Sequence, residues 1–292
     1  MTHLLTPTEV DQLRGVKFTL PKLIERGQTG RHQATQKGSS VEFSQHREYA
    51  PGDPIKHLDW KAFARSNRYV IKEFESESNL QVVLILDRSE SMAFSDNSTQ
   101  SKLSFACRLI HGLTWLLLQQ GDAVGLVTFS NDEPTYVPPS SAGQQLHRIE
   151  AELNQTRSRG STSFDQIVEF INVQCRSNTV CIFISDLLDD ESTSAQHIVQ
   201  LKKKRYPTYC IHILSPSEFR LTEADPTIYR DEESDEELLS EPLAIKAAYD
   251  LEIDRWCKAI RLECHHHGIP YVFSTTDAAP VATLLNMMGH HS

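Results

Sequence analysis

Three near-continuous apolar runs limit what this chain can fold into more than any other feature. They are VVLIL (82–86), VCIFI (180–184) and YCIHIL (209–214), and none alternates regularly between apolar and polar residues. A strand with one face in water does alternate, whereas strands buried on both faces are typical of a mostly parallel sheet covered by helices on two sides. The runs therefore predict an α/β core.

Strand and helix patterns alternate along the chain from residue 80 onward. In a doubly wound sheet, such an alternation places helices on both faces, and sites form beyond the carboxyl ends of the strands. We therefore expect residues 80–292 to form a doubly wound, mostly parallel, Rossmann-like sheet. The expected strands are 80–87, 122–130, 178–185, 207–214 and 269–275, and the expected helices are about 100–120, 143–153, 163–175, 192–204, 243–266 and 279–288.

The first 79 residues are less periodic and predict a separate N-terminal subdomain of short strands and helices packed on the core. Residues 41–49 (VEFSQHREY) and 69–77 (YVIKEFESE) alternate between apolar and polar side chains, as half-exposed strands do. A short helix is expected from Asp59 onward. Another is expected to open at TPTE (6–9), which fits a capping box.

A strongly acidic segment interrupts the α/β pattern. Residues 223–242 carry nine carboxylates and one arginine. We interpret the region at about 216–242 as an acidic hairpin insertion between a strand and the long helix that follows. The hairpin is either simply solvated or an acidic patch that binds a partner.

Composition excludes several classes of protein. The chain has 292 residues and is 39% hydrophobic, yet it contains no run of roughly 18 to 20 apolar residues, so no membrane span is expected. Because its N-terminal sequence has no basic-then-apolar pattern, we expect a cytoplasmic protein. A net charge of −10 argues against a nucleic-acid partner, which requires a basic surface. The six cysteines are scattered, which favours buried, reduced thiols.

The first apolar run ends in an aspartate followed by two serines at intervals of two. In a loop that leaves a strand, residues two apart can point the same way, so the side chains of Asp87, Ser89 and Ser91 can converge. Carboxylate and hydroxyl oxygens suit a hard cation. Mg²⁺ binds one or two carboxylates and keeps positions for other ligands, so this loop predicts a magnesium site.

Two further oxygen-bearing residues lie where neighbouring strand ends are expected. Thr162 immediately precedes a predicted helix, and Asp186 follows the second apolar run. Either residue alone would indicate little. Together with the Asp-x-Ser-x-Ser loop, they complete an ordered set of candidate metal ligands: Asp87, Ser89, Ser91, Thr162 and Asp186.

This set resembles the metal-ion-dependent adhesion site of von Willebrand factor type A domains, which contains the sequence seen here as DRSESM (87–92). The resemblance implies that Asp87, Ser89, Ser91 and Thr162 hold the metal directly or through water. It implies that Asp186 acts mainly from outside the first ring of ligands. The expected ion is Mg²⁺, with Mn²⁺ and Ca²⁺ as alternatives.

A longer pattern is similar to the bacterial family known as domain of unknown function 58, with a von Willebrand factor A-like domain. It includes the Glu-Phe, Tyr-x-Pro-Gly-Asp and Asp-Trp landmarks within residues 41–77, then LILDRSESM (84–92) and FISDLLD (183–189). The family is usually encoded beside MoxR-type AAA+ ATPases. The resemblance therefore implies a MoxR-type ATPase, or a client protein with an acidic ligand residue, as the partner.

The chain departs from these patterns at two places. Lys56 and His57 stand in a segment where the family commonly has an arginine. Leu187 follows Asp186 where many adhesion-type domains have a glycine.

Three functions remain open from the sequence. The first is a non-enzymatic, metal-dependent adaptor, in which an acidic residue of a partner completes the metal shell. The second is a magnesium-dependent phosphohydrolase that uses Asp87 as the nucleophile, although residue 89 is a serine where such enzymes need a second aspartate. The third is a structural domain that binds no metal, in which the serines only cap local turns.

Overall fold

The computed structural model of the chain divides into two compact units, residues 1–30 with 80–292 and residues 31–79, and each is described by itself. The large unit contains the predicted α/β core. The structure describes residues 4–18, 41–49, 59–66, 69–76, 80–96, 100–161, 164–176, 178–188, 194–204, 206–221, 227–230, 237–240 and 242–289.

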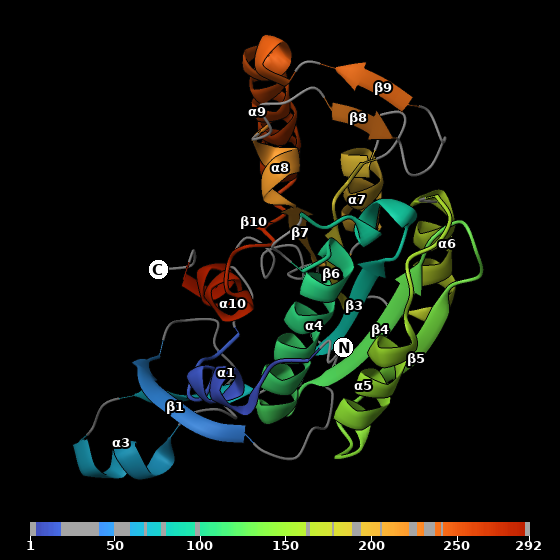
Figure 1. Cartoon of the computed structure of the whole chain (residues 1–292). Helices are drawn as coiled ribbons and strands as arrows, with labels where there is room; N and C mark the ends of the chain where they lie inside the picture. Colours follow the sequence, from blue (N-terminus) through green and yellow to red (C-terminus); the bar gives the residue numbers. More distant parts are fainter. Residues whose placement is uncertain are drawn as a thin grey trace. The chain divides into compact units, whose positions relative to one another are not determined.

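A six-stranded sheet with the order β10-β7-β6-β3-β4-β5 forms the centre of the large unit (Figure 1). All neighbouring strands run parallel except β5, which is antiparallel to β4. The prediction of a doubly wound, mostly parallel sheet is confirmed. The strands are β3 (Gln81–Asp87), β4 (Ala123–Phe129), β5 (Thr135–Ser140), β6 (Val180–Ser185), β7 (Thr208–Leu214) and β10 (Tyr271–Thr275).

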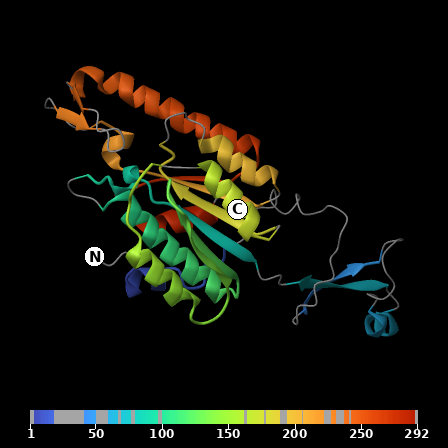
Figure 2. The same ribbon diagram turned by 90° about the vertical axis from the view of Figure 1, so that its right-hand side faces the viewer.

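The period of two along β3 separates two hydrophobic cores. Leu84 and Leu86 are buried in one core, and Val83 and Ile85 are buried in the other. Each apolar run is thus buried on both faces, which is why it does not alternate. Helices α1 (Pro7–Gln12), α4 (Lys102–Gln119), α5 (Gln145–Gln155) and α10 (Pro280–Gly289) border the first core, and α6 (Phe164–Gln174), α7 (Ser194–Lys203) and α9 (Pro242–His266) cover the second (Figures 1 and 2).

Helix α4 lies across the first core and begins beside the end of the sheet where the candidate site was expected. Its N-cap is Ser101, whose side chain accepts a hydrogen bond from the backbone N–H of Ser104 (3.2 Å). Gly112 allows α10 to approach closely, because a Cβ at this position would lie 2.6 Å from a methyl carbon of Leu284. The cap therefore fixes where the first turn of α4 starts, and the glycine fixes how deeply the helix packs.

The first described segment belongs to the large unit, although we expected it in the N-terminal subdomain. Leu5, Leu13 and Phe18 are buried in the same core as α4. The backbone N–H of Leu5 also donates to Nδ1 of His111 in α4 (3.1 Å). Apolar side chains on both flanks of α1 bind this segment to the core, and its short length hides their helical spacing in the sequence.

The small unit contains the two strands and the helix that the sequence predicts. Strand β1 (Val41–Glu48) is antiparallel to β2 (Val70–Ser76), and α3 spans Trp60–Ser66. Asp59 caps this helix by accepting from the N–H of Ala62 (3.1 Å). The landmark Asp-Trp pair thus marks a helix start in this unit. Lys56 and His57 lie outside the described residues.

Three elements near the site were not predicted. The 3-10 helix η3 (Glu90–Ala93) directly follows Ser89. Helix α8 is a single turn, Pro216–Phe219, and the edge strand β5 contains two prolines, which only an edge strand tolerates. In the acidic segment, β8 (Thr227–Arg230) pairs antiparallel with β9 (Glu237–Ser240), where the hairpin was expected. Among the described helices, none is both long and apolar enough to cross a membrane.

Candidate metal centre

The loops that follow β3 and β6 lie side by side at the carboxyl edge of the sheet. These strands are parallel neighbours with Leu86 opposite Ile184, so Asp87 and Asp186 emerge at the same edge. Both aspartates are completely buried. Ser185 links the two loops, because its hydroxyl donates to Oδ2 of Asp87 (2.7 Å) and accepts from the backbone N–H of Leu187 (2.9 Å).

Asp87 is held by neutral donors. Its Oδ1 accepts from the backbone N–H of Ser89 (2.9 Å), and its Oδ2 accepts from the hydroxyl of Ser185 (2.7 Å). Burial raises the pKa of Asp87 to about 6, and the negative charge of Asp186 adds to this effect, while the hydrogen bonds from Ser185 and Ser89 oppose it. A positive charge beside Asp87 would therefore stabilise its ionised form.

The two serines converge as the sequence predicts. The hydroxyl oxygens of Ser89 and Ser91 lie 3.1 Å apart. Ser89 is completely buried, whereas Ser91 is half-buried and begins to face the surface. Three of the predicted ligand residues, Asp87, Ser89 and Ser91, thus bring a carboxylate and a hydroxyl pair to one loop.

A glycine loop lies against this serine loop. The backbone N–H of Glu90 donates to the carbonyl of Gly160 (2.8 Å). Gly160 has a φ of +68°, and a Cβ there would clash with the side chain of Asn131 at 2.0 Å, so this position requires glycine. The predicted ligand Thr162 lies two residues further on, outside the described residues.

Asp186 has a different environment from Asp87. Its Oδ1 accepts from the backbone N–H of Leu188 (3.2 Å), and its Oδ2 accepts from the ammonium of Lys102 (2.7 Å). The intervening Leu187 has a φ of 56°, in the left-handed region where a glycine is common. Because the Leu187 side chain is completely buried in the second core, packing holds it in this conformation.

The sequence did not predict that a lysine, Lys102, lies at this centre. It occupies the first turn of α4 and is completely buried, with Nζ also 2.5 Å from Oε1 of Glu218. Burial lowers the pKa of Lys102, but the charges of Asp186 and Glu218 outweigh it, so the net shift is upward. A lysine at a helix N-terminus opposes the helix dipole, and this was the one sequence feature that could have drawn attention to it.

Glu218 closes the arrangement from α8. Its second oxygen, Oε2, accepts from the backbone N–H and the hydroxyl of Ser215 (2.7 and 2.9 Å), which forms the capping box of that helix. Next to it, Ser217 donates to the carboxylate of Asp96 from its backbone N–H (3.1 Å) and its hydroxyl. Helix α8 is thereby fixed both to α4 and to the segment that follows the serine loop.

Among the described residues, carboxylates outnumber cations at this edge of the sheet. Asp186 and Glu218 pair with the ammonium of Lys102, and the negative charge of Asp186 also acts on Asp87. The guanidinium of Arg88 does not offset them, because its electrostatic partners are Arg159, Asp132 and Glu152.

Histidine does not balance the charges either. Burial lowers the pKa of His212 to about 4, although the charge of Asp186 opposes the shift, so this side chain is neutral near pH 7. Among these described residues, the carboxylates therefore outnumber the positive charges, and such an environment favours a divalent cation.

The available donors fit a hard cation better than a transition metal. Within the described part of the chain, no three or more histidine, cysteine, aspartate and glutamate side chains gather as a metal-binding group. The donors on offer are one carboxylate and two hydroxyls in the serine loop, with a second carboxylate adjacent. Such an oxygen set suits Mg²⁺ or Ca²⁺.

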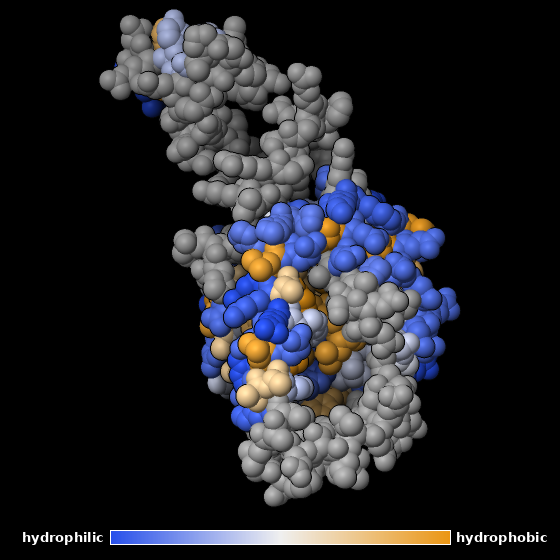
Figure 3. Space-filling view, turned by 90° about the horizontal axis from the view of Figure 1, so that it is seen from above, coloured by the Kyte–Doolittle hydropathy of each residue, from blue (hydrophilic) through white to orange (hydrophobic). Residues whose placement is uncertain are grey.

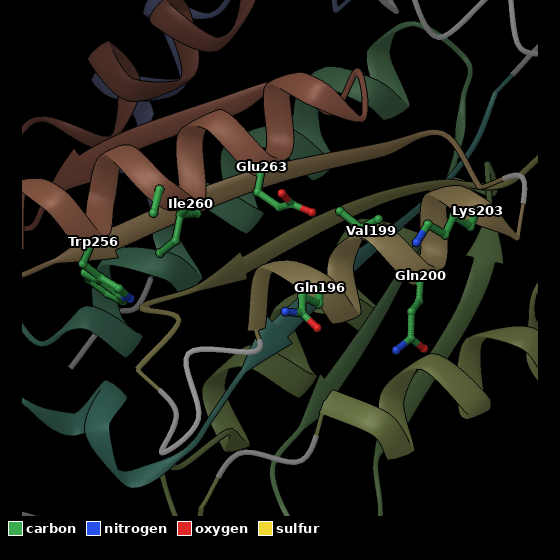
Figure 4. A pocket seen from close by; sticks show the side chains of 8 residues that line it. Gln196, Val199, Gln200, Lys203, Trp256, Ile260 and Glu263 are labelled. Atoms are coloured by element: carbon green, nitrogen blue, oxygen red, sulfur yellow. The ribbon is translucent and has the colours of Figure 1, made fainter.

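The described surface at the carboxyl end of the sheet is mostly hydrophilic, with apolar residues among the polar ones (Figure 3). Figure 3 looks from above, onto the end of the sheet toward which β3 and β4 point in Figure 1, and most of its coloured surface is hydrophilic. A separate groove of about 420 Å³ lies between α7 and α9, where Gln196, Val199, Trp256 and Ile260 face one another (Figure 4). This groove contains none of the predicted metal ligands.

Comparison with protein families shows where the chain belongs. Residues 45–254 match the family described as "Protein of unknown function DUF58". The chain belongs to the DUF58 family. The match includes the small unit's landmarks from Gln45 onward, the serine loop and both aspartates, so the family resemblance predicted from the sequence is confirmed.

The chain is also similar in sequence to curated proteins of bacteria. The chain is 22% identical over 225 residues to the uncharacterized protein Rv1480 of Mycobacterium tuberculosis, a match that covers 76% of this chain and 70% of that protein. It is 31% identical over 121 residues to YeaD of Bacillus subtilis, covering 41% of this chain and 27% of YeaD.

Two solved structures are similar to the chain at low sequence identity. BatB from Bacteroides thetaiotaomicron has 17% identity and a TM-score of 0.46, with 73% of this chain and 98% of that chain covered. The SpRpn10 VWA domain has 15% identity and a TM-score of 0.39, with 71% and 94% covered.

Proposed function

We propose that this DUF58 protein is a non-enzymatic, metal-dependent adaptor that binds a partner protein through the centre at the end of β3. Asp87, Ser89, Ser91 and Thr162 would hold Mg²⁺, or Mn²⁺ or Ca²⁺ in its place, and Asp186 would act from outside the first ring of ligands. The observation that carries the proposal is the hydroxyl pair of Ser89 and Ser91, 3.1 Å apart, in the same loop as the completely buried carboxylate of Asp87.

Asp87 and Ser91 would have different roles at the metal centre. Asp87 supplies the anchoring charge, and its orientation is set by the N–H of Ser89 and the hydroxyl of Ser185. Half-buried Ser91 lies on the outer side, where an external ligand would arrive. A bound divalent cation supplies positive charge that an acidic side chain of a partner can complete. Binding of the partner would then depend on the metal.

The partner class follows from the family resemblance. A MoxR-type AAA+ ATPase, or a client protein that carries an accessible Asp or Glu, fits a role in assembling or maturing a protein complex. Cytoplasmic residence is part of this proposal.

Binding is favoured over catalysis by the environment of Asp87. Both of its carboxylate oxygens accept hydrogen bonds, and its side chain is completely buried, so it is poorly placed to attack a phosphorus atom. The nearest candidate for a general acid, at position 89, is a serine.

The proposal is tested by titrating the purified protein with Mg²⁺ and Mn²⁺ in a calorimeter. We expect one site in the wild type, none in Asp87→Asn, and wild-type behaviour in Asp277→Asn, which changes an exposed aspartate that follows β10. A pull-down from lysate with and without EDTA then tests the partner. If the wild type binds no divalent cation, the proposal is wrong. If the wild type shows metal-dependent phosphatase activity that Asp87→Asn lacks, the protein is an enzyme instead of an adaptor.

A further inference from the structure

We propose that Lys102 is a built-in counter-charge that keeps the affinity of the centre for its divalent cation low. The inference rests on the proposed function, because it concerns the same site. It assigns a role in setting metal affinity to a residue of α4 that lies outside the serine loop, the glycine loop and the two strand ends.

The ammonium of Lys102 already engages the second carboxylate at this edge, that of Asp186. Its Nζ lies 2.7 Å from Oδ2 of Asp186, and the other oxygen of that carboxylate accepts from the N–H of Leu188. Asp186 therefore has both oxygens engaged before any metal arrives. In addition, a fixed positive charge beside the site repels a divalent cation, and this repulsion is strong where water is excluded.

The structure leaves Lys102 no alternative position. The side chain is completely buried, and its Nζ is also 2.5 Å from Oε1 of Glu218. Glu218 is itself held by the N–H and hydroxyl of Ser215. At the other end, Ser101 caps the helix that carries Lys102. The ammonium is thus fixed at both ends and cannot withdraw into solvent when a cation binds.

A weak site has a consequence for partner binding. With Asp186 engaged by Lys102, the protein offers the cation the carboxylate of Asp87, which accepts from a backbone N–H and a hydroxyl, together with the hydroxyls of Ser89 and Ser91. An acidic side chain from the partner then contributes a large share of the total negative charge. Because Lys102 weakens metal binding, the protein would keep the cation only while the partner is bound. The metal and the partner would then bind and dissociate together.

The test is the metal affinity of Lys102→Met, measured by calorimetric titration with Mn²⁺ and compared with the wild type. Methionine keeps the length and the apolar stem but removes the charge. We expect Mn²⁺ to bind at least tenfold more tightly to Lys102→Met. Glu218→Gln, which keeps the ammonium on Asp186, should bind Mn²⁺ no more tightly than the wild type. Lys258→Met, an exposed lysine of α9, controls for the change in net charge.

A second measurement covers the case in which Lys102→Met folds poorly. Without the ammonium, Asp186 and Glu218 lose their shared counter-ion, so the metal-free variant should melt at a lower temperature than the wild type. If the cation can replace the lysine's charge, saturating Mg²⁺ should raise the melting temperature of Lys102→Met by more than it raises that of the wild type. Circular dichroism with and without Mg²⁺ measures both shifts.

The possible results distinguish failure of the role of Lys102 from failure of the proposed function. Equal or weaker Mn²⁺ binding by Lys102→Met, in a wild type that does bind Mn²⁺, overturns the role of Lys102 and leaves the proposed function intact. A variant that stays unfolded even in saturating Mg²⁺ also overturns it, because the cation then fails to stand in for the ammonium. A wild type that binds no divalent ion removes the proposed function itself.

Discussion

The loops after β3 and β6 deliver one buried aspartate each to the same edge of the sheet, yet they neutralise those aspartates in different ways. Asp87 is held by neutral donors, a backbone N–H and a serine hydroxyl. Asp186 is held by the ammonium of Lys102. One carboxylate thus accepts hydrogen bonds from two neutral groups, whereas the other forms part of a buried ion pair.

This difference shows how one edge can combine a stable scaffold with a site for a ligand. A buried ion pair with several hydrogen bonds fixes geometry, and removal of one partner is costly. Burial and the negative charge of Asp186 disfavour the ionised form of Asp87, so a cation beside Asp87 would be stabilising. We therefore propose a scaffolding role for Asp186 with Lys102, and a ligand-binding role for Asp87.

The largest effect is expected for Asp186→Ala. This change removes one of the two carboxylates that neutralise Lys102, and we expect a loss of about 3 kcal/mol in the free energy of unfolding, since Glu218 still holds the ammonium. Urea denaturation followed by circular dichroism measures it. Asp254→Ala is the matched control, because its pair with Arg220 is half-exposed and should contribute less than about 1 kcal/mol. Similar losses in both variants would contradict the scaffolding role.

A smaller loss is expected for Ser185→Ala, which removes the link between the two loops. The hydroxyl donates to Asp87 and accepts from the N–H of Leu187, and both partners are buried. Leaving them unpaired should cost about 2 kcal/mol in the free energy of unfolding. Ser274→Ala removes a buried strand serine that is paired with another neutral hydroxyl, and should cost less. If both variants lose the same free energy of unfolding, the link between the two loops contributes no more to stability than an ordinary pair of hydroxyls.

The sequence predicted the sheet and the serine loop because their patterns are local. The apolar runs specify buried parallel strands, and the interval of two between Asp87, Ser89 and Ser91 brings three side chains to one loop. The six cysteines are also free, and four of them are buried, as expected. Each of these features can be inferred from a few neighbouring residues.

Features that depend on distant residues were missed. Lys102 contacts Asp186 and Glu218, which lie 84 and 116 residues further along the chain. No local sequence pattern can therefore predict these ion pairs. Helix α8 is a single turn, too short for a helical period, and β5 is hidden by its prolines. Residues 4–18 lack a period long enough to show that they pack on α4 and α10.

The smallest effect, and the only one expected to increase stability, is that of Asp87→Asn in the absence of metal. Because the pKa of Asp87 is raised to about 6 in the folded protein, from an ordinary value near 3.8, the folded state holds its proton more tightly than the unfolded state does. The penalty for ionising Asp87 is therefore absent below about pH 4, grows between about pH 4 and 6, and is complete above pH 6. Asparagine avoids this penalty, but its single amide oxygen can accept from only one of the Ser89 N–H and the Ser185 hydroxyl. We therefore expect a net gain of about 1 kcal/mol at pH 7.5 that disappears by pH 4. Urea denaturation in EDTA across this pH range measures the gain, and Asp277→Asn should show none. A loss of stability in Asp87→Asn at pH 7.5 would mean that Asp87, like Asp186, already has its counter-charge within the fold.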